Sequence, residues 1–331
     1  MHRISRICIS ALTTAGLYLM SAPAQMPGDD PGRMKNVVWL TPEASLQPVF
    51  AHKAPVESAL PMTVFVLPER DFSPAAVEGE LLETTIEGGM SIKNETEYFV
   101  DAPEILRQGP GLSLPADQVQ ILIIHTHSSE AYTQAGLDRY EPSDRGRTED
   151  TQFNVVRIGD ELTEIFSEYG LGVIHDRAIY DYPSYTGSYN RSGAAVEQYL
   201  ESYPGITVVL DIHRDALGSE GVVYKTMAEE EGSVASQIML LCGTDASGLE
   251  HPQWRQNLSL ALYMQNAVVQ NHPTLMRPVQ LVRERYNQHL SPGSMIVEVG
   301  SSGNTLQEAL AAVRLFGHAV APELVKLIEE N

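Results

Sequence analysis

Cysteine and basic residues are both scarce in this chain. Only two of its 331 residues are cysteines, Cys8 and Cys242, and Cys8 lies in a segment that we expect to be removed. One remaining cysteine excludes an internal disulfide, and it excludes a thiolate-based structural zinc site, which needs at least two. Lys and Arg number 22 against 43 Asp and Glu, so the formal net charge is −21. Phosphate binding needs clustered Lys and Arg, so nucleic acid is not an expected partner.

The sequence also lacks internal repeats, low-complexity tracts and long apolar runs, with one exception at the amino terminus. Arg3 and Arg6 precede an apolar run of about 16 residues, which ends in Ala-Pro-Ala at positions 22–24. This layout is typical of a secretory signal peptide, and it predicts cleavage after Ala24. The run is shorter than the roughly 20 residues that span a bilayer, although a retained anchor is the alternative. We therefore expect residues 1–24 to export the protein to an extracytoplasmic location.

The rest of the chain divides by composition into two parts. Residues 25–116 are rich in Pro, Ala and Glu, and they predict a linker with short strands. Those strands are Thr63–Leu67, Met90–Lys93 and Tyr98–Val100. Residues 117–331 show the hydrophobic periodicity of a globular domain, which we expect to be catalytic.

Strands and helices alternate along this second part. Strands are predicted at 119–127, 171–176, 206–213, 236–242 and 294–300, those at 119–127 and 206–213 as buried strands. Helices are predicted at 154–169, 192–203, 254–270 and 305–330. Such alternation indicates an α/β fold with a mostly parallel sheet, covered by helices on both faces.

Three of the predicted strands end in residues that bind metals or carry protons. In open α/β sheets the ligand crevice lies outside the carboxyl ends of the strands, so these side chains are expected at one edge. They are His125, His127 and Glu130 at the end of the first strand, Asp211, His213 and Asp215 on the third, and Glu298 on the last.

Two histidines and a carboxylate, with one position left for water, are the ligand set of a catalytic zinc. His127 and Glu130 have His-x-x-Glu spacing, and His213 would complete the set from another strand. Alternation along an extended strand places His125 on the same face as His127, so His125 is expected behind the ligands. Asp150, near a predicted helix start, is the alternative carboxylate ligand. Taken singly, each histidine could instead be an ordinary hydrogen-bonding partner of a carbonyl.

Glu298 differs from these ligands because it lies within an otherwise apolar strand. An unpaired carboxylate is costly to bury there, unless the strand is at a sheet edge and the side chain faces water. The functional interpretation is a general base that takes a proton from zinc-bound water, whose pKa is lowered to about 7.

Several segments, in this order, resemble the stage II sporulation protein P family of cell-wall hydrolases. They are IIHTHSSEAYT, NVVRIGDEL, DRAIYDYPSYTGSYNRS, VVLDIHRDA, LCGTDASGLEHPQWRQNL and RYNQHLSPGSMIVEVGSSGNTLQEAL. The resemblance extends from about Ser91 to the carboxyl terminus.

This resemblance implies a relative of the zinc-dependent N-acetylmuramoyl-L-alanine amidases, with a fold like that of zinc carboxypeptidases. The implied substrate is peptidoglycan, cut at the amide between muramic acid and L-alanine and also within stem peptides. His127, Glu130 and His213 are the implied zinc ligands, and Glu298 is the implied catalytic carboxylate. Other wall hydrolases or membrane proteins are candidate partners. Members from endospore formers keep a membrane anchor, whereas Ala-Pro-Ala here predicts release, and nothing in the sequence shows that its owner sporulates.

Two further features could serve this chemistry. Arg191 or Arg214 could stabilise the oxyanion, and a surface salt bridge is the alternative for each. Four tyrosines in residues 180–192 suit a groove wall that contacts sugars or stem peptides, although a turn-rich loop has the same composition. Two other functions remain open. One is a carboxypeptidase-like metallopeptidase on free peptides, and the other is a non-catalytic wall-binding scaffold, which would have no need of Glu298.

Overall fold

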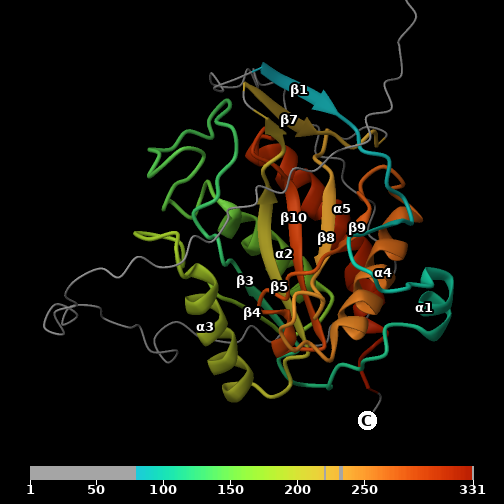
Figure 1. The fold of residues 1–331 in the computed structure, drawn as a ribbon. Coiled ribbons are helices and arrows are strands. Elements are labelled where there is room, and N and C mark those ends of the chain that lie inside the picture. The colour runs from blue at the N-terminus through green and yellow to red at the C-terminus, as the bar shows by residue number, and fades with distance from the viewer. Residues whose placement is uncertain (1–79, 220, 231–233, 330–331) are drawn as a thin grey trace, which may run out of the picture. The chain divides into compact units, whose positions relative to one another are not determined.

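The computed structural model describes residues 80–219, 221–230 and 234–329 (Figure 1). The predicted signal segment 1–24 and the predicted strand Thr63–Leu67 lie outside the described residues.

A seven-stranded sheet with the order β2-β9-β8-β10-β5-β3-β4 forms the centre of the described chain (Figure 1). Its strands are β2 (Ile92–Asn94), β3 (Ile121–Ile124), β4 (Val173–His175), β5 (Val208–Asp215), β8 (Ile238–Cys242), β9 (Val279–Leu281) and β10 (Gly293–Ser301). All neighbouring pairs are parallel except β10 with β8, which is antiparallel. This arrangement confirms the predicted α/β fold with a mostly parallel sheet.

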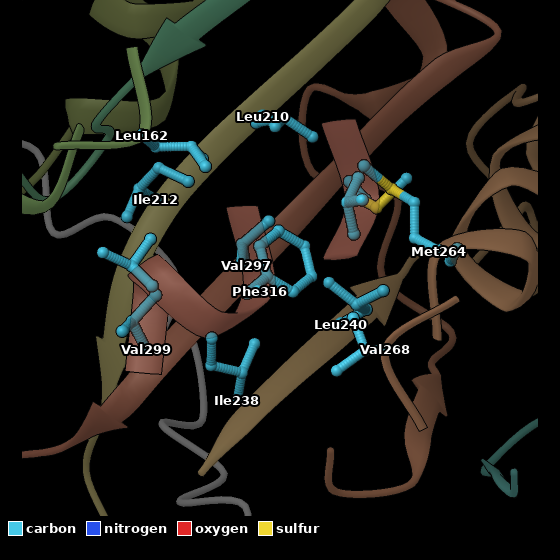
Figure 2. Packing of buried hydrophobic residues seen from close by; sticks show 14 of the residues in the cluster. Leu162, Leu210, Ile212, Ile238, Leu240, Met264, Val268, Val297, Val299 and Phe316 are labelled. Carbon is cyan, nitrogen blue, oxygen red and sulfur yellow. The ribbon is translucent and has the colours of Figure 1, made fainter. Parts of the chain in front are cut away.

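Three helices cover one face of this sheet. They are α2 (Val155–Glu168), α4 (Trp254–Val269) and α5 (Leu306–Val325). Figure 2 shows Leu240 and Val297 of the sheet close to Val268 of α4 and Phe316 of α5, all of them fully buried. Because side chains alternate along a strand, Leu210, Ile212, Val297 and Val299 turn toward these helices, and the residues between them face the other way.

The opposite face of the sheet is covered by α3 (Ser188–Ser202) and by the segment that includes η2 (Gln288–Leu290). Val196 of α3 lines a small cavity together with Val209, Ile296 and Gln288. Helices therefore lie on both faces, and the face under α3 is the one toward which Asp211, His213 and Glu298 point.

Residues 80–116 contribute strands to both sheets of the described chain. β1 (Glu80–Thr84) pairs with β7 (Val222–Thr226), which also pairs with β6 (Gly218–Ser219) in a second sheet. β2 joins the central sheet, and a short helix, α1 (Ala102–Gln108), follows it. The prediction of a strand at Tyr98–Val100 was wrong, because the structure has no strand there. Tyr98 instead stacks on Trp254 of α4, with ring centroids 4.9 Å apart. The start of the catalytic domain at residue 117 stays a prediction.

The helix termini follow local capping chemistry. The Asn154 side chain accepts a hydrogen bond from the backbone N–H of Val156, so α2 begins directly after it. Thr305 and Glu308 form a reciprocal capping box at the start of α5. None of the helices in the described part of the chain is long and apolar enough to cross a membrane.

Replacement of Phe316 by alanine tests this core. Phe316 is fully buried in the main cluster, so Phe316→Ala should lower the free energy of unfolding by about 3–5 kcal/mol, through lost burial and a residual cavity. Urea unfolding followed by circular dichroism measures the change. Leu137→Ala is the control because Leu137 is 76% exposed, and it should change stability little. Equal stabilities of the two variants would contradict this packing.

Candidate functional site

The predicted site residues on β5 and β10 lie side by side. β5 and β10 are parallel neighbours, and their register places Glu298 directly beside His213. Both side chains project from the face opposite Ile212 and Val297, which pack in the helix-covered core. The predicted juxtaposition of a histidine and a carboxylate from two strands is therefore present.

The turn after β3 brings two more predicted residues to His213. β3 ends at Ile124, and residues 126–129 form a turn that carries His127 and Glu130. Oε2 of Glu130 lies 3.5 Å from Nδ1 of His213. The rings of His127 and His213 are perpendicular, with centroids 5.3 Å apart. The three predicted ligands thus converge from two neighbouring strands.

His125 lies on the other side of the sheet. Its Nε2 is 2.8 Å from Nε2 of His175, and its Nδ1 is 3.1 Å from the carbonyl oxygen of Ile212. Both rings approach Gly159 of α2, where a Cβ atom would lie 2.7 Å from Nε2 of His125. The prediction that His125 and His127 face the same side was wrong, because the extended strand, and with it the alternation, ends at Ile124.

The charges around the buried Glu130–His213 pair favour the ionised form of each residue. Burial alone would raise the pKa of Glu130, but Arg214 and His213 lower this pKa to about 2. Burial alone would likewise lower the pKa of His213, but Asp211 and Glu130 raise it well above its usual value. Burial and the neighbouring His213 lower the pKa of His127 to about 4. The surroundings therefore favour the protonated form of His213, which lies between two carboxylates, and the neutral form of His127.

Glu298 has a different environment from Glu130. Burial and the nearby Asp215 raise the pKa of Glu298 to about 8. Its Oε2 atom is buried without a hydrogen-bond partner among the described residues. A buried carboxyl group with a perturbed pKa, next to a histidine, is a typical candidate for proton transfer.

The two arginines predicted to stabilise an oxyanion donate to backbone carbonyls. The Arg214 side chain donates to Ala131 and Gly146, each at 3.0 Å, while its backbone N–H donates to Glu130 Oε2. Arg191 donates to the carbonyls of Tyr180, Ser184 and Thr186. Both guanidinium groups therefore tie together the loops around the site.

Arg147 is a residue that sequence reasoning missed. It forms an ion pair with Asp181 and lies 3.5 Å from Oε1 of Glu130. Its guanidinium carbon also lies 5.0 Å from the ring centroid of Tyr185. Arg147 reaches the site because its own turn pairs with Glu130 through an isolated bridge, and no local sequence signal reports such a contact.

The tyrosine-rich segment reaches the site through two of its four tyrosines. The ring of Tyr185 stacks on His127 with centroids 4.5 Å apart, and Tyr189 meets His127 edge-on at 5.4 Å. Tyr180 instead donates a hydrogen bond to Asp176, and Tyr182 is 45% exposed. Tyr185 and Tyr189 therefore form a wall beside His127.

Asp150, the alternative carboxylate ligand, is exposed and accepts a hydrogen bond from the backbone N–H of Gln152. The helix does not begin at Asp150, since its cap is Asn154.

The donor types at this site fit zinc, but the described geometry completes only part of the ligand set. Two donors of a tetrahedral zinc, each about 2.0–2.1 Å from the metal, lie about 3.4 Å apart, close to the 3.5 Å between His213 Nδ1 and Glu130 Oε2. His127 instead contacts the Tyr185 hydroxyl through Nε2 and the Ser188 hydroxyl through Nδ1. Accordingly, no three His, Cys, Asp or Glu side chains in the described ranges have the spacing to hold a metal ion.

Fold and site together define an α/β protein with a histidine–carboxylate centre at the ends of adjacent parallel strands. A family model described as stage II sporulation protein P matches residues 70–321, so the chain belongs to the stage II sporulation protein P family. It is 23% identical over 213 residues to the stage II sporulation protein P of Bacillus subtilis (strain 168). That match covers 61% of this chain and 50% of the relative, so the chain spans about half of that protein's length.

Two solved structures of amidases are distantly similar to the chain. The N-acetylmuramoyl-L-alanine amidase AmiC2 of Nostoc punctiforme is 14% identical, with a TM-score of 0.37 over 63% of this chain and 96% of that one. The CwlD amidase of Clostridioides difficile, solved in complex with the GerS lipoprotein, is 13% identical. Its TM-score is also 0.37, over 62% of this chain and 98% of that one.

Proposed function

We propose that this protein is a zinc-dependent peptidoglycan hydrolase that cleaves the amide between N-acetylmuramic acid and L-alanine. The observation that carries the proposal is the convergence of Glu298, His213 and Glu130 on one sheet face. Glu298 is paired in register with His213, and Nδ1 of His213 lies 3.5 Å from Oε2 of Glu130. The motif resemblance to the family supports the choice of substrate.

Glu298 acts in this proposal as the general acid and base. Its free, buried Oε2 atom accepts a proton from the attacking water and returns it to the leaving nitrogen. A nearby cation favours the charged form of a carboxyl group, so an ion held by the neighbouring residues would lower the pKa of Glu298 from about 8. The protein loaded with metal would then hold Glu298 in the form that accepts a proton.

His127, Glu130 and His213 would hold the zinc, His127 by turning away from Tyr185. When bound, zinc polarises the scissile carbonyl and lowers the pKa of water to about 7. Glu130 is fixed for this role by the Arg214 N–H and by Arg147. A carboxylate held ionised by fixed donors needs no proton loss before it binds a cation.

Arg191 and Arg214 support the site in this proposal by holding loops. Arg191 donates to the carbonyls on both sides of Tyr185, and Arg214 donates to the residue after Glu130. These bonds fix the tyrosine wall and the Glu130 turn. Their predicted role as oxyanion donors stays untested.

We also propose that the protein acts outside the cytoplasmic membrane, since its substrate is extracytoplasmic. The basic and apolar segment 1–24 supports export, either with cleavage after Ala24 or as an anchor.

Metal removal is the experiment that tests this function. A chelator should stop the release of stem peptides from purified peptidoglycan, and added zinc should restore it. Far-UV circular dichroism should hardly change, because the main apolar core lies on the opposite face of the sheet. Hydrolysis that persists after complete metal removal would contradict the proposal, and loss of most secondary structure would make the metal structural.

A further inference from the structure

Asp211 has not been assigned a role, although its carboxylate contacts two residues at the site. It receives hydrogen bonds from the backbone N–H of Thr126 at 2.7 Å and from the Thr126 hydroxyl at 2.6 Å. Its Oδ1 atom also lies 2.9 Å from Nε2 of His213. Asp211 therefore contacts both the histidine on its own strand and the turn that carries His127.

Thr126 is itself held by a chain of polar side chains. Its hydroxyl lies 2.7 Å from the Ser192 hydroxyl of α3, which accepts a hydrogen bond from the Asn287 side chain at 3.1 Å. Since the Thr126 hydroxyl donates to Asp211, the Ser192 hydroxyl donates to Thr126. This chain fixes the direction in which the Asp211 carboxylate faces.

We propose that Asp211 is a positioning residue, which holds the His213 ring so that Nδ1 is the metal-binding nitrogen. Each ring nitrogen of His213 faces a carboxylate, and Nε2 is the closer, at 2.9 Å from Asp211 against 3.5 Å between Nδ1 and Glu130. Nε2 has no aligned hydrogen bond among the described residues, and a small rotation of the ring would let a neutral His213 donate its Nε2 proton to Asp211. The lone pair then lies on Nδ1, which faces Glu130 at 3.5 Å. Metal-binding histidines commonly donate their other ring N–H to a carboxylate, which fixes the ring orientation.

The same contacts exclude Asp211 from two other roles. Both of its oxygens already accept hydrogen bonds from Thr126, and one of them also faces His213. It therefore has little capacity to act as a ligand or as the general base. This inference rests on the proposed zinc function, but it concerns the zinc affinity rather than the reaction.

Asp211→Asn tests the inference. The amide can donate to Nε2 of His213 and so favours a proton on Nδ1, where the metal would bind. We expect zinc affinity, measured by chelator competition, to fall roughly 10–100-fold. Asp160→Asn is the matched control: Asp160 contacts His175 Nδ1 at 3.2 Å, away from the ligands, and this variant should bind zinc like the wild type.

If Asp211→Asn does not fold, the variant Thr126→Val and an NMR spectrum of the wild type test the same inference. Thr126→Val removes one of the hydrogen bonds to Asp211 and should weaken zinc binding by a smaller factor. In the zinc-loaded wild type, ¹⁵N NMR of His213 should show a metal-bound Nδ1 and a protonated Nε2. Coordination through Nε2, or equal zinc affinities of Asp211→Asn and the wild type, would overturn this inference alone. A wild type without a zinc site would overturn the proposed function as well.

Discussion

Glu298→Gln should abolish most of the hydrolysis while it leaves zinc and the fold in place. The amide has nearly the size and shape of the carboxyl group, but it cannot take the proton from water. Turnover should therefore fall by at least roughly 10²–10⁴, the usual effect of losing one acid–base group. Zinc content, together with the initial rate of muropeptide release, measures this result. KM should hardly change, since the carboxylate acts mainly in the transition state.

A stability measurement provides an independent check on the environment of Glu298. Its pKa in the folded, metal-free protein is about 8, above the ordinary value of 4.5. At a pH between these two pKa values, the carboxyl group keeps its proton in the folded chain and has lost it in the unfolded chain. This group therefore lowers the free energy of unfolding of the wild type as pH rises. Metal-free Glu298→Gln should lack that part of the pH dependence.

The exposed Glu83→Gln serves as the matched control, because the Glu83 side chain is 69% exposed and remote in sequence from the predicted motifs. It should keep both the wild-type rate and the wild-type dependence of stability on pH. A metal-replete Glu298→Gln that cleaves peptidoglycan at the wild-type rate would remove Glu298 from the mechanism. Asp215, which pairs with Arg277 at 2.8 Å and raises the pKa of Glu298, would then be an alternative base.

Glu130→Gln should eliminate both bound zinc and hydrolysis. A neutral amide is a much weaker zinc ligand than a carboxylate. The substitution also removes one of the two negatively charged carboxylates that contact His213. His127→Ala and His213→Ala should have the same effect on zinc, whereas Asp150→Ala should keep it, since Asp150 is exposed. Metal analysis after gel filtration, with circular dichroism to confirm folding, measures this result. If Glu130→Gln kept its zinc and Asp150→Ala lost it, the carboxylate ligand would be Asp150.

The sequence was most informative where hydrophobic periodicity is strong. The strands at 208–215 and 293–301 and the helices α2, α4 and α5 lie close to their predicted ranges, because their buried faces require regular spacing. The sequence predicted that Glu298 and His213 lie near one edge of the sheet, whereas their pairing in register depends on the strand order that the structure shows.

The errors and omissions lie where the regular backbone ends. His125 was placed by strand alternation, but the strand ends one residue earlier, and the ring packs against Gly159 of α2. Arg147 reaches Glu130 through a turn whose path depends on tertiary pairing. Asp211 was predicted only to lie among the polar residues at the strand ends, because its hydrogen bonds to Thr126 depend on how two strands align. Such contacts are set by the fold and leave no local pattern in the sequence.

The nature of the new ends formed in digested peptidoglycan tests the central claim most directly. Purified, zinc-loaded protein should release stem peptides that carry a free L-alanine amino group, and it should leave the lactyl carboxyl group on muramic acid. Mass spectrometry of the products identifies both ends. Digestion that produces new glycan reducing ends, cuts only within stem peptides, or forms no new ends would contradict the account.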